Sequence, residues 1–167
     1  MDFIIRNEEE KDIQQVREIV RSTFPTEAES KLVDALRESG KAVISLVAVN
    51  NEEVLGHILF SPVSTTPPGE AKGIGLAPVA VKPEYQSRGI GSQLIREGLR
   101  LCKQQHYDYC VVLGSPEYYG RFGFEKASGF DLQNEYGVED EFMVIFFSES
   151  RARGLIKYEL EFSMFSV

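Results

Sequence analysis

The feature that most limits the fold of this chain is the stretch 79–92, where an apolar strand passes through a glycine-containing turn into a helix. The strand pattern ends at Val81, and apolar residues at helical spacing begin at Ile90. Backbone N–H groups at a helix start lack partners within the helix and carry partial positive charge. They bind phosphate groups without the help of many cationic side chains. The stretch therefore predicts a phosphate-binding loop.

The predicted phosphate loop consists of Gln86, Ser87, Arg88, Gly89, Ile90, Gly91 and Ser92. The two glycines allow phosphate oxygens to approach the backbone closely, and Arg88 can add a charge-assisted hydrogen bond. The residues exclude a Walker loop, which needs Lys-Ser/Thr after its last glycine, whereas Gly91 is followed by Ser92-Gln93. It also excludes a dinucleotide fingerprint, which needs a third glycine where Leu94 stands. An ordinary glycine-rich turn with a structural purpose is the alternative.

The rest of the chain predicts a mixed α/β fold of the α+β type, with a largely antiparallel sheet flanked by helices. Two helix starts are indicated by the capping pairs Asn7–Glu10 and Thr26–Glu29. The hydrophobic periodicity predicts helices over 12–24, 26–39, 89–104 and 117–122. It predicts strands over 3–5, 43–49, 54–63, 74–81, 109–113 and 142–147, and a weaker one over 158–162.

The composition limits the class of protein. A chain of 167 residues with 43% hydrophobic residues fits one domain, residues 1–167, with a substantial core. No apolar run approaches the roughly 20 residues that cross a bilayer, and two cysteines make neither a disulfide framework nor a zinc site. These features predict a cytoplasmic protein without a metal. The net charge of −8 argues against nucleic acid as a partner and favours a neutral or cationic substrate.

Two motifs together resemble one known family. The run 75–81, Gly-Leu-Ala-Pro-Val-Ala-Val, leads into the phosphate loop, and the run 118–124, Tyr-Tyr-Gly-Arg-Phe-Gly-Phe, follows the next predicted strand. The chain resembles the GNAT superfamily (general control non-repressible related N-acetyltransferases), and within it a bacterial subgroup of predicted acetyltransferases. The resemblance covers most of the chain and is strongest over 75–124. It implies an N-acetyltransferase that uses acetyl-CoA and a central strand splayed from its neighbour.

The resemblance also implies roles for individual residues. It assigns the pyrophosphate of acetyl-CoA to the phosphate loop and the pantetheine arm to the backbone groups of Val79 and Val81, beside Pro78. Proline in a strand agrees with a lost pairing, although a purely structural bulge is the alternative. Tyr119 corresponds to the general acid near the cofactor sulfur. Tyr118 is the fallback acid and a second cofactor contact, and simple core packing of both rings is the alternative.

The general base is the weak point of the interpretation. Some relatives use a carboxylate on the strand before the loop, but 74–81 contains none, and an asparagine found in others is absent from 113–116. His57 is one candidate base, with Ser61 further along the same strand. We expect transfer of an acetyl group to a primary amine by direct attack. A non-catalytic acyl-CoA sensor and a module binding another phosphate are the alternatives. The acceptor, the acyl-chain preference and the oligomeric state, a homodimer included, stay open.

Overall fold

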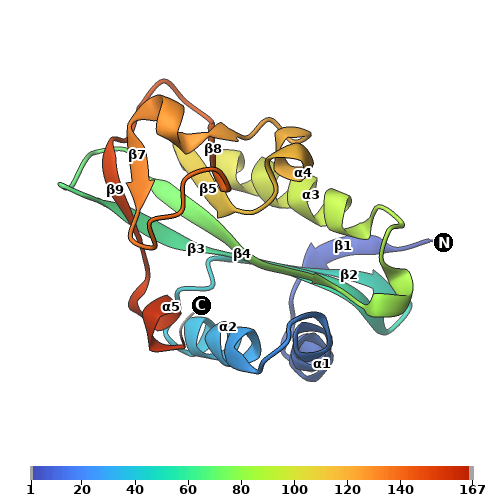
Figure 1. Cartoon of the computed structure of the whole chain (residues 1–167). Coiled ribbons are helices and arrows are strands. Elements are labelled where there is room, and N and C mark those ends of the chain that lie inside the picture. Colours follow the sequence, from blue (N-terminus) through green and yellow to red (C-terminus); the bar gives the residue numbers. More distant parts are fainter. Residues whose placement is uncertain (1, 166–167) are drawn as a thin grey trace. The chain divides into compact units, whose positions relative to one another are not determined.

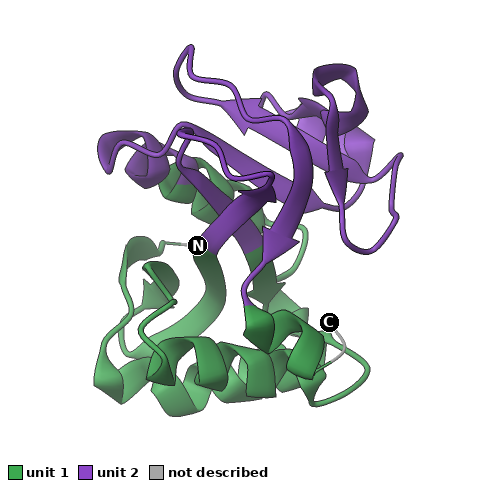
Figure 2. Cartoon of the chain, turned by 90° about the vertical axis from the view of Figure 1, so that its left-hand side faces the viewer, with its two compact units in different colours: residues 1–61, 77–98, 160–167 green, residues 62–76, 99–159 purple. Residues whose placement is uncertain are grey.

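The computed structural model describes residues 2–165, so residues 1, 166 and 167 of the predicted domain lie outside the described residues. The chain divides into two compact units (Figure 2). The first unit comprises residues 1–61, 77–98 and 160–167, and the second comprises residues 62–76 and 99–159. The expectation of one domain stays a prediction. No helix among residues 2–165 is long and apolar enough to cross a membrane.

The first unit is built on an antiparallel sheet. β1 (Ile4–Asn7) pairs with β2 (Ile44–Asn50), and β2 pairs with β3 (Glu53–Thr66), whose first part belongs to this unit. The connection between β2 and β3 turns at Asn51, whose φ of 55° is in the left-handed region that asparagine tolerates. The predicted hairpin is therefore confirmed. β3 is one residue longer than expected at its start and three residues longer at its end, where its last residues pair with another strand.

Helices cover both faces of this sheet (Figure 1). α1 (Ile13–Thr23) and α2 (Ala28–Glu38) lie on one face and bury Val16, Ile19, Val20, Leu32, Val33 and Leu36. The first part of α3 (Ile90–Gln104) lies on the other face, since a side chain added at Gly56 would lie 3.1 Å from Leu94. Because side chains alternate along a strand, His57 points to the face covered by α1 and α2. The short helix α5 (Leu160–Met164) is joined to this unit by the ion pair Lys41–Glu161 at 2.9 Å.

The second unit combines parallel and antiparallel pairings. β4 (Gly73–Val81) begins here and pairs in parallel with β5 (Tyr109–Leu113) over Gly73–Gly75. β5 pairs antiparallel with β8 (Phe142–Phe146), which also holds β6 (Glu125–Lys126). The end of β3 pairs with β9 (Gly154–Tyr158), and β9 pairs in parallel with β7 (Leu132–Asn134). α4 (Pro116–Gly120) follows β5, and single-turn helices cover Glu10–Asp12, Pro83–Tyr85 and Ala127–Phe130.

The predicted class, a mixed α/β fold with a largely antiparallel sheet and flanking helices, is confirmed. The splay of the central strand involves both units and stays a prediction. The strand predicted over 158–162 is wrong, because β9 ends at Tyr158 and α5 begins at Leu160. The cap at Asn7 is also wrong, because Asn7 belongs to β1 and the capping box joins Glu9 to Asp12. The short strands β6 and β7 were not predicted.

Candidate functional site

The phosphate loop lies in the first unit and has the backbone of an anion-binding turn. Ser87 and Gly89 have φ values of 62° and 85°, both in the left-handed region. Alternation of such residues with ordinary ones turns successive N–H groups toward one concavity that attracts anions. Residues 86–89 are exposed, and α3 starts at the buried Ile90. The left-handed Ser87 was not predicted, because serine carries no sequence signal for that conformation.

Gly89 leaves space where a phosphate could approach. A Cβ added there would have no described atom within 4 Å. The carbonyl of Gly89 accepts a hydrogen bond from the Gln93 N–H at 3.1 Å, so this residue directly precedes the first turn of α3. The orphan amides of that turn therefore begin next to an open backbone position. Arg88 is exposed and its guanidinium lies 5.7 Å from the centre of the Tyr85 ring. The loop residues fit a diphosphate.

The start of the loop is fixed to the strands of the first unit. Lys82 donates its backbone N–H to Leu55 O at 2.8 Å, and its ammonium group lies 2.7 Å from the Glu53 carboxylate. The Tyr85 hydroxyl donates to the same carboxylate at 3.3 Å. The hydrogen bond from Lys82 lowers the pKa of Glu53, so this pair is ionised at neutral pH. These contacts hold the loop in place before any ligand arrives.

Val79 and Val81, the residues expected to contact pantetheine, lie in the last part of β4 and are half-buried. The Val81 carbonyl accepts a hydrogen bond from the Gln86 side chain at 3.1 Å. Gln86 thus closes the turn onto the strand, a role that the sequence had not shown. Pro78 is buried within β4, which continues as a strand on both sides of it.

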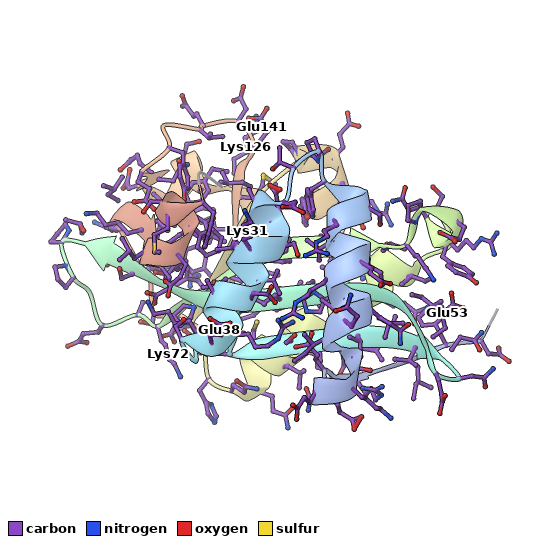
Figure 3. All side chains as sticks on the ribbon, turned by 90° about the horizontal axis from the view of Figure 1, so that it is seen from below. Lys31, Glu38, Glu53, Lys72, Lys126 and Glu141 are labelled. Carbon is purple, nitrogen blue, oxygen red and sulfur yellow. The ribbon has the colours of Figure 1, made fainter. Side chains whose placement is uncertain are left out.

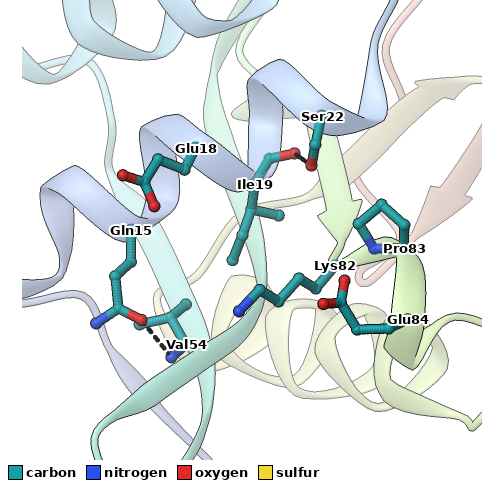
Figure 4. A pocket seen from close by; sticks show the side chains of 8 residues that line it. All are labelled: Gln15, Glu18, Ile19, Ser22, Val54, Lys82, Pro83 and Glu84. Carbon is teal, nitrogen blue, oxygen red and sulfur yellow. Dashed lines mark hydrogen bonds between the residues drawn. The ribbon is translucent and has the colours of Figure 1, made fainter.

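A cavity of about 260 Å³ lies beside the start of the loop (Figure 4). It is lined by Gln15, Glu18, Ile19, Ser22, Val54, Lys82, Pro83 and Glu84. The Gln15 side chain accepts a hydrogen bond from the Val54 N–H at 2.9 Å, and Ser22 donates to the Ile19 carbonyl at 2.8 Å. None of the predicted site residues lines this cavity, so it is a neighbour of the loop and not the predicted site itself.

Tyr118 and Tyr119 lie in the second unit, on the single turn of α4. Ser115 caps that turn by accepting the Tyr118 N–H at 3.3 Å. Tyr119 is buried, and its ring packs so closely on Gly114 that a Cβ there would lie 2.3 Å from it. Tyr118 and Phe124 meet the Tyr119 ring edge to face, at 5.1 and 5.7 Å between centroids. Burial raises the pKa of Tyr119 to about 12, so its hydroxyl is protonated at neutral pH and can donate a proton.

His57 lies in the first unit and has no exposed surface. Its Nε2 atom lies 2.8 Å from the Ser45 hydroxyl and 3.7 Å from the Glu8 carboxylate. Burial lowers the pKa of His57 to about 4; Glu8 opposes this shift and Arg37 adds to it. The imidazole is therefore neutral at pH 7, but an acceptor amine has no exposed face of the ring to meet. Its role as the general base stays a prediction.

The sequence of the chain matches a known family, and the fold and the phosphate loop agree with that match. The family model of the acetyltransferase (GNAT) domain matches residues 4–127, which is most of the chain. This chain belongs to the GNAT family. It is an acyltransferase of the GNAT type, as expected from the two motifs.

GNAT relatives cover nearly the whole length of the chain. The Escherichia coli protein YhbS, an uncharacterized N-acetyltransferase, is 37% identical over 98% of this chain and 100% of its own length. A crystal structure of E. coli YhbS in complex with CoA has a TM-score of 0.91, with 34% identity over 96% of this chain and 92% of that one. A crystal structure of a GNAT acetyltransferase from Brucella melitensis in complex with acetyl-CoA has a TM-score of 0.82. Its sequence is 34% identical, and the match covers 96% of this chain and 98% of that one.

Proposed function

We propose that this chain transfers the acetyl group of acetyl-CoA to a primary amine by direct attack of that amine. The observation that carries the proposal is the phosphate loop, in which left-handed Ser87 and Gly89 precede the first turn of α3. Two relatives that are each 34% identical bind CoA or acetyl-CoA, which supports the same ligand here. The acceptor is the amine of a small molecule or of a protein. A cytoplasmic location is part of the proposal.

The proposed roles follow the described geometry of each unit. In the first unit, the amides of Gln86–Ser92 and the Arg88 side chain hold the pyrophosphate, and the backbone of Val79 and Val81 holds pantetheine. In the second unit, Tyr119 donates a proton to the departing thiolate, and Tyr118 contacts the cofactor. Acetyl-CoA supplies an activated thioester, whose carbonyl carbon the amine attacks. The Tyr119 hydroxyl is protonated at neutral pH, as an acid must be before it donates a proton.

Ligand binding and turnover test the proposal separately. Acetyl-CoA should raise the melting temperature, whereas ATP and NAD should not, because neither carries a pantetheine arm. Release of CoA thiol over a panel of primary amines would establish catalysis. Binding of acetyl-CoA without thiol release on any amine would identify the chain as an acyl-CoA sensor. No stabilisation by acetyl-CoA would refute both functions.

Replacement of Tyr119 by Phe tests the acid. We expect kcat to fall by about 10²-fold, as is typical when a general acid is lost, with an almost unchanged KM for acetyl-CoA. Tyr118→Phe, one residue away on the same helical turn, is the matched comparison and should lower kcat much less. Equal effects of the two substitutions, measured by thiol release, would remove Tyr119 from the mechanism.

A further inference from the structure

One carboxylate, that of Glu53, joins both ends of the turn that leads into the phosphate loop. Glu53 is the first residue of β3 and is labelled in Figure 3. Its Oε2 atom lies 2.7 Å from the Lys82 ammonium group, and its Oε1 atom accepts the Tyr85 hydroxyl at 3.3 Å. Lys82 is the N-cap residue of the single-turn helix Pro83–Tyr85, and Tyr85 is its last residue. The carboxylate on the hairpin therefore spans the whole turn.

The turn Pro83–Tyr85 is not held by burial in the core. None of its three residues is buried, so the hydrophobic effect contributes little to its placement. At its start, the Lys82 N–H donates to Leu55 O on β3 at 2.8 Å. At its end, the Gln86 N–H donates to Pro83 O at the long distance of 3.4 Å. Polar contacts at the two ends therefore set the orientation of the turn, and the Glu53 carboxylate makes one contact at each end.

The Tyr85 ring connects this turn to the phosphate loop. The Arg88 guanidinium lies 5.7 Å from the centre of the ring, within the range of a cation–π contact. Arg88 is exposed, and an unrestrained arginine side chain samples many rotamers. Ordering such a side chain when a ligand binds lowers the affinity for that ligand. Because the hydrogen bond to Glu53 fixes the ring, the guanidinium has a fixed surface to rest on, and part of this ordering is complete before a diphosphate arrives.

We propose that Glu53 and Tyr85 are positioning residues for the cofactor: Glu53 orients the turn Pro83–Tyr85, and the Tyr85 ring holds the Arg88 guanidinium toward the pyrophosphate. This inference rests on the function proposed above. Neither Glu53 nor Tyr85 needs to touch acetyl-CoA, because each acts through the next residue and only Arg88 meets the ligand. The arrangement favours ligands that carry a diphosphate. It does not affect the pantetheine arm, which is assigned to the backbone of β4.

A double-mutant cycle tests whether Tyr85 acts through Arg88. Tyr85→Leu removes the ring and should raise the dissociation constant of CoA by about threefold, the value of a cation–π contact at an exposed site. Arg88→Gln should raise it by about tenfold, the value of one hydrogen bond to a charged group. In the Arg88→Gln background, Tyr85→Leu should have no further effect, because the side chain that it positions is gone. Calorimetric titrations that show the same effect of Tyr85→Leu in both backgrounds, or none in either, would overturn the inference.

The role of Glu53 is tested by the direction of a change in affinity. Glu53→Gln and Glu52→Gln each remove one negative charge at adjacent positions of the hairpin, and Glu52 is exposed. If these charges acted only through the electric field, both substitutions would strengthen the binding of anionic CoA. We expect Glu53→Gln to weaken it instead, by about fivefold, since the loosened turn must be ordered on binding. Glu52→Gln should not weaken it. Affinity of Glu53→Gln for CoA equal to or higher than that of wild type would refute the positioning role.

Pantetheine separates positioning from general damage to the fold. It has the thiol arm of CoA but no diphosphate, so its dissociation constant, measured by NMR titration, should be the same in wild type, Glu53→Gln and Tyr85→Leu. The side chains of Lys82 and Glu53 are 31% and 41% exposed, and ion pairs of this kind contribute little to stability. Glu53→Gln should therefore leave the melting temperature almost unchanged. Equal losses of affinity for CoA and for pantetheine would show that the substitutions disturb the fold, and would overturn the inference.

The same measurements distinguish a failure of this inference from a failure of the proposed function. If wild type and the Glu53 and Tyr85 variants bind CoA equally well, the positioning role is wrong and the proposed transferase function stands. If the variants lose affinity for CoA as expected while no amine releases thiol, the positioning role stands and the transferase function fails. If wild type does not bind CoA, no pyrophosphate reaches the loop and both are wrong.

Discussion

Replacement of Gly89 by Ala should weaken acetyl-CoA binding far more than it destabilises the protein. The backbone at Gly89 has a φ of 85°, which costs an L-residue about 1 kcal/mol. A Cβ there meets no described atom within 4 Å, so no steric clash adds to that cost. In a chain of 167 residues, about 1 kcal/mol lowers the melting temperature by roughly 2–4 °C.

The effect on binding has a different origin. The added methyl group would occupy the open space beside the loop amides, where a phosphate oxygen must come within about 2.9 Å of a backbone nitrogen. Loss of one hydrogen bond to a charged oxygen is worth about 1.5–3 kcal/mol. The dissociation constant of acetyl-CoA should therefore rise by about 10- to 100-fold. Calorimetric titration measures this change directly.

Gly40→Ala separates the backbone cost from the loss of binding. Gly40 has a φ of 75°, follows α2, and also has no described atom within 4 Å of an added Cβ. The two variants should lose similar stability, but only Gly89→Ala should lose affinity for acetyl-CoA. Equal dissociation constants for the two variants would refute the idea that this loop holds the pyrophosphate.

Three further predictions concern stability. Gly98→Ala places a Cβ 2.3 Å from the buried Phe60 ring, so urea unfolding should show a loss of about 1–2 kcal/mol despite the higher helix propensity of alanine; a gain would contradict the packing. The pKa of His57 is lowered to about 4, so between pH 6.5 and 4 the imidazole binds a proton in the unfolded chain but not in the folded one. The free energy of unfolding should therefore fall by about 3 kcal/mol as the pH drops through that window. In urea titrations, His57→Gln should flatten this dependence of stability on pH. Asp12→Asn should lower the free energy of unfolding by about 1.5–3 kcal/mol at pH 7, because Arg6 binds this carboxylate at 2.7 and 3.0 Å and lowers its pKa. The difference in stability from wild type should shrink as the pH falls below about 4, and a constant difference would disprove the charge argument.

The elements that the sequence predicted well are those with a strong local period. The hairpin of β2 and β3, the helix α3 and the buried strand β5 all carry long apolar patterns, and the structure confirms them. The wrong strand over 158–162 has a different cause. Tyr158, Leu160 and Phe162 alternate with two glutamates, a pattern that suggests a strand. Only the pairing of β9 with β3 and β7 decides where the strand ends. Non-local contacts of this kind leave no mark in a five-residue window.

In the candidate site, too, some residues could be predicted from local sequence and others depend on the folded chain. Gly89 and the turn of Tyr118 and Tyr119 could be found because each belongs to a sequence motif. The left-handed Ser87 and the closure of the turn by Gln86 onto Val81 could not, since both depend on the path of the backbone after the strand. His57 was chosen as a base for its residue type alone. The structure buries its ring completely, and its role as the base stays a prediction.

The capping pair predicted at Thr26 and Glu29 is not formed in the structure. The pair Thr26–Glu29 matches the sequence pattern of a capping box, in which the glutamate would accept a hydrogen bond from the backbone N–H at the start of the helix. In the structure α2 starts later, with Glu27 as its N-cap residue, and the Thr26 hydroxyl accepts the Ala28 N–H at 3.2 Å. Glu29 is thereby released from capping, and its Oε1 is buried without a partner.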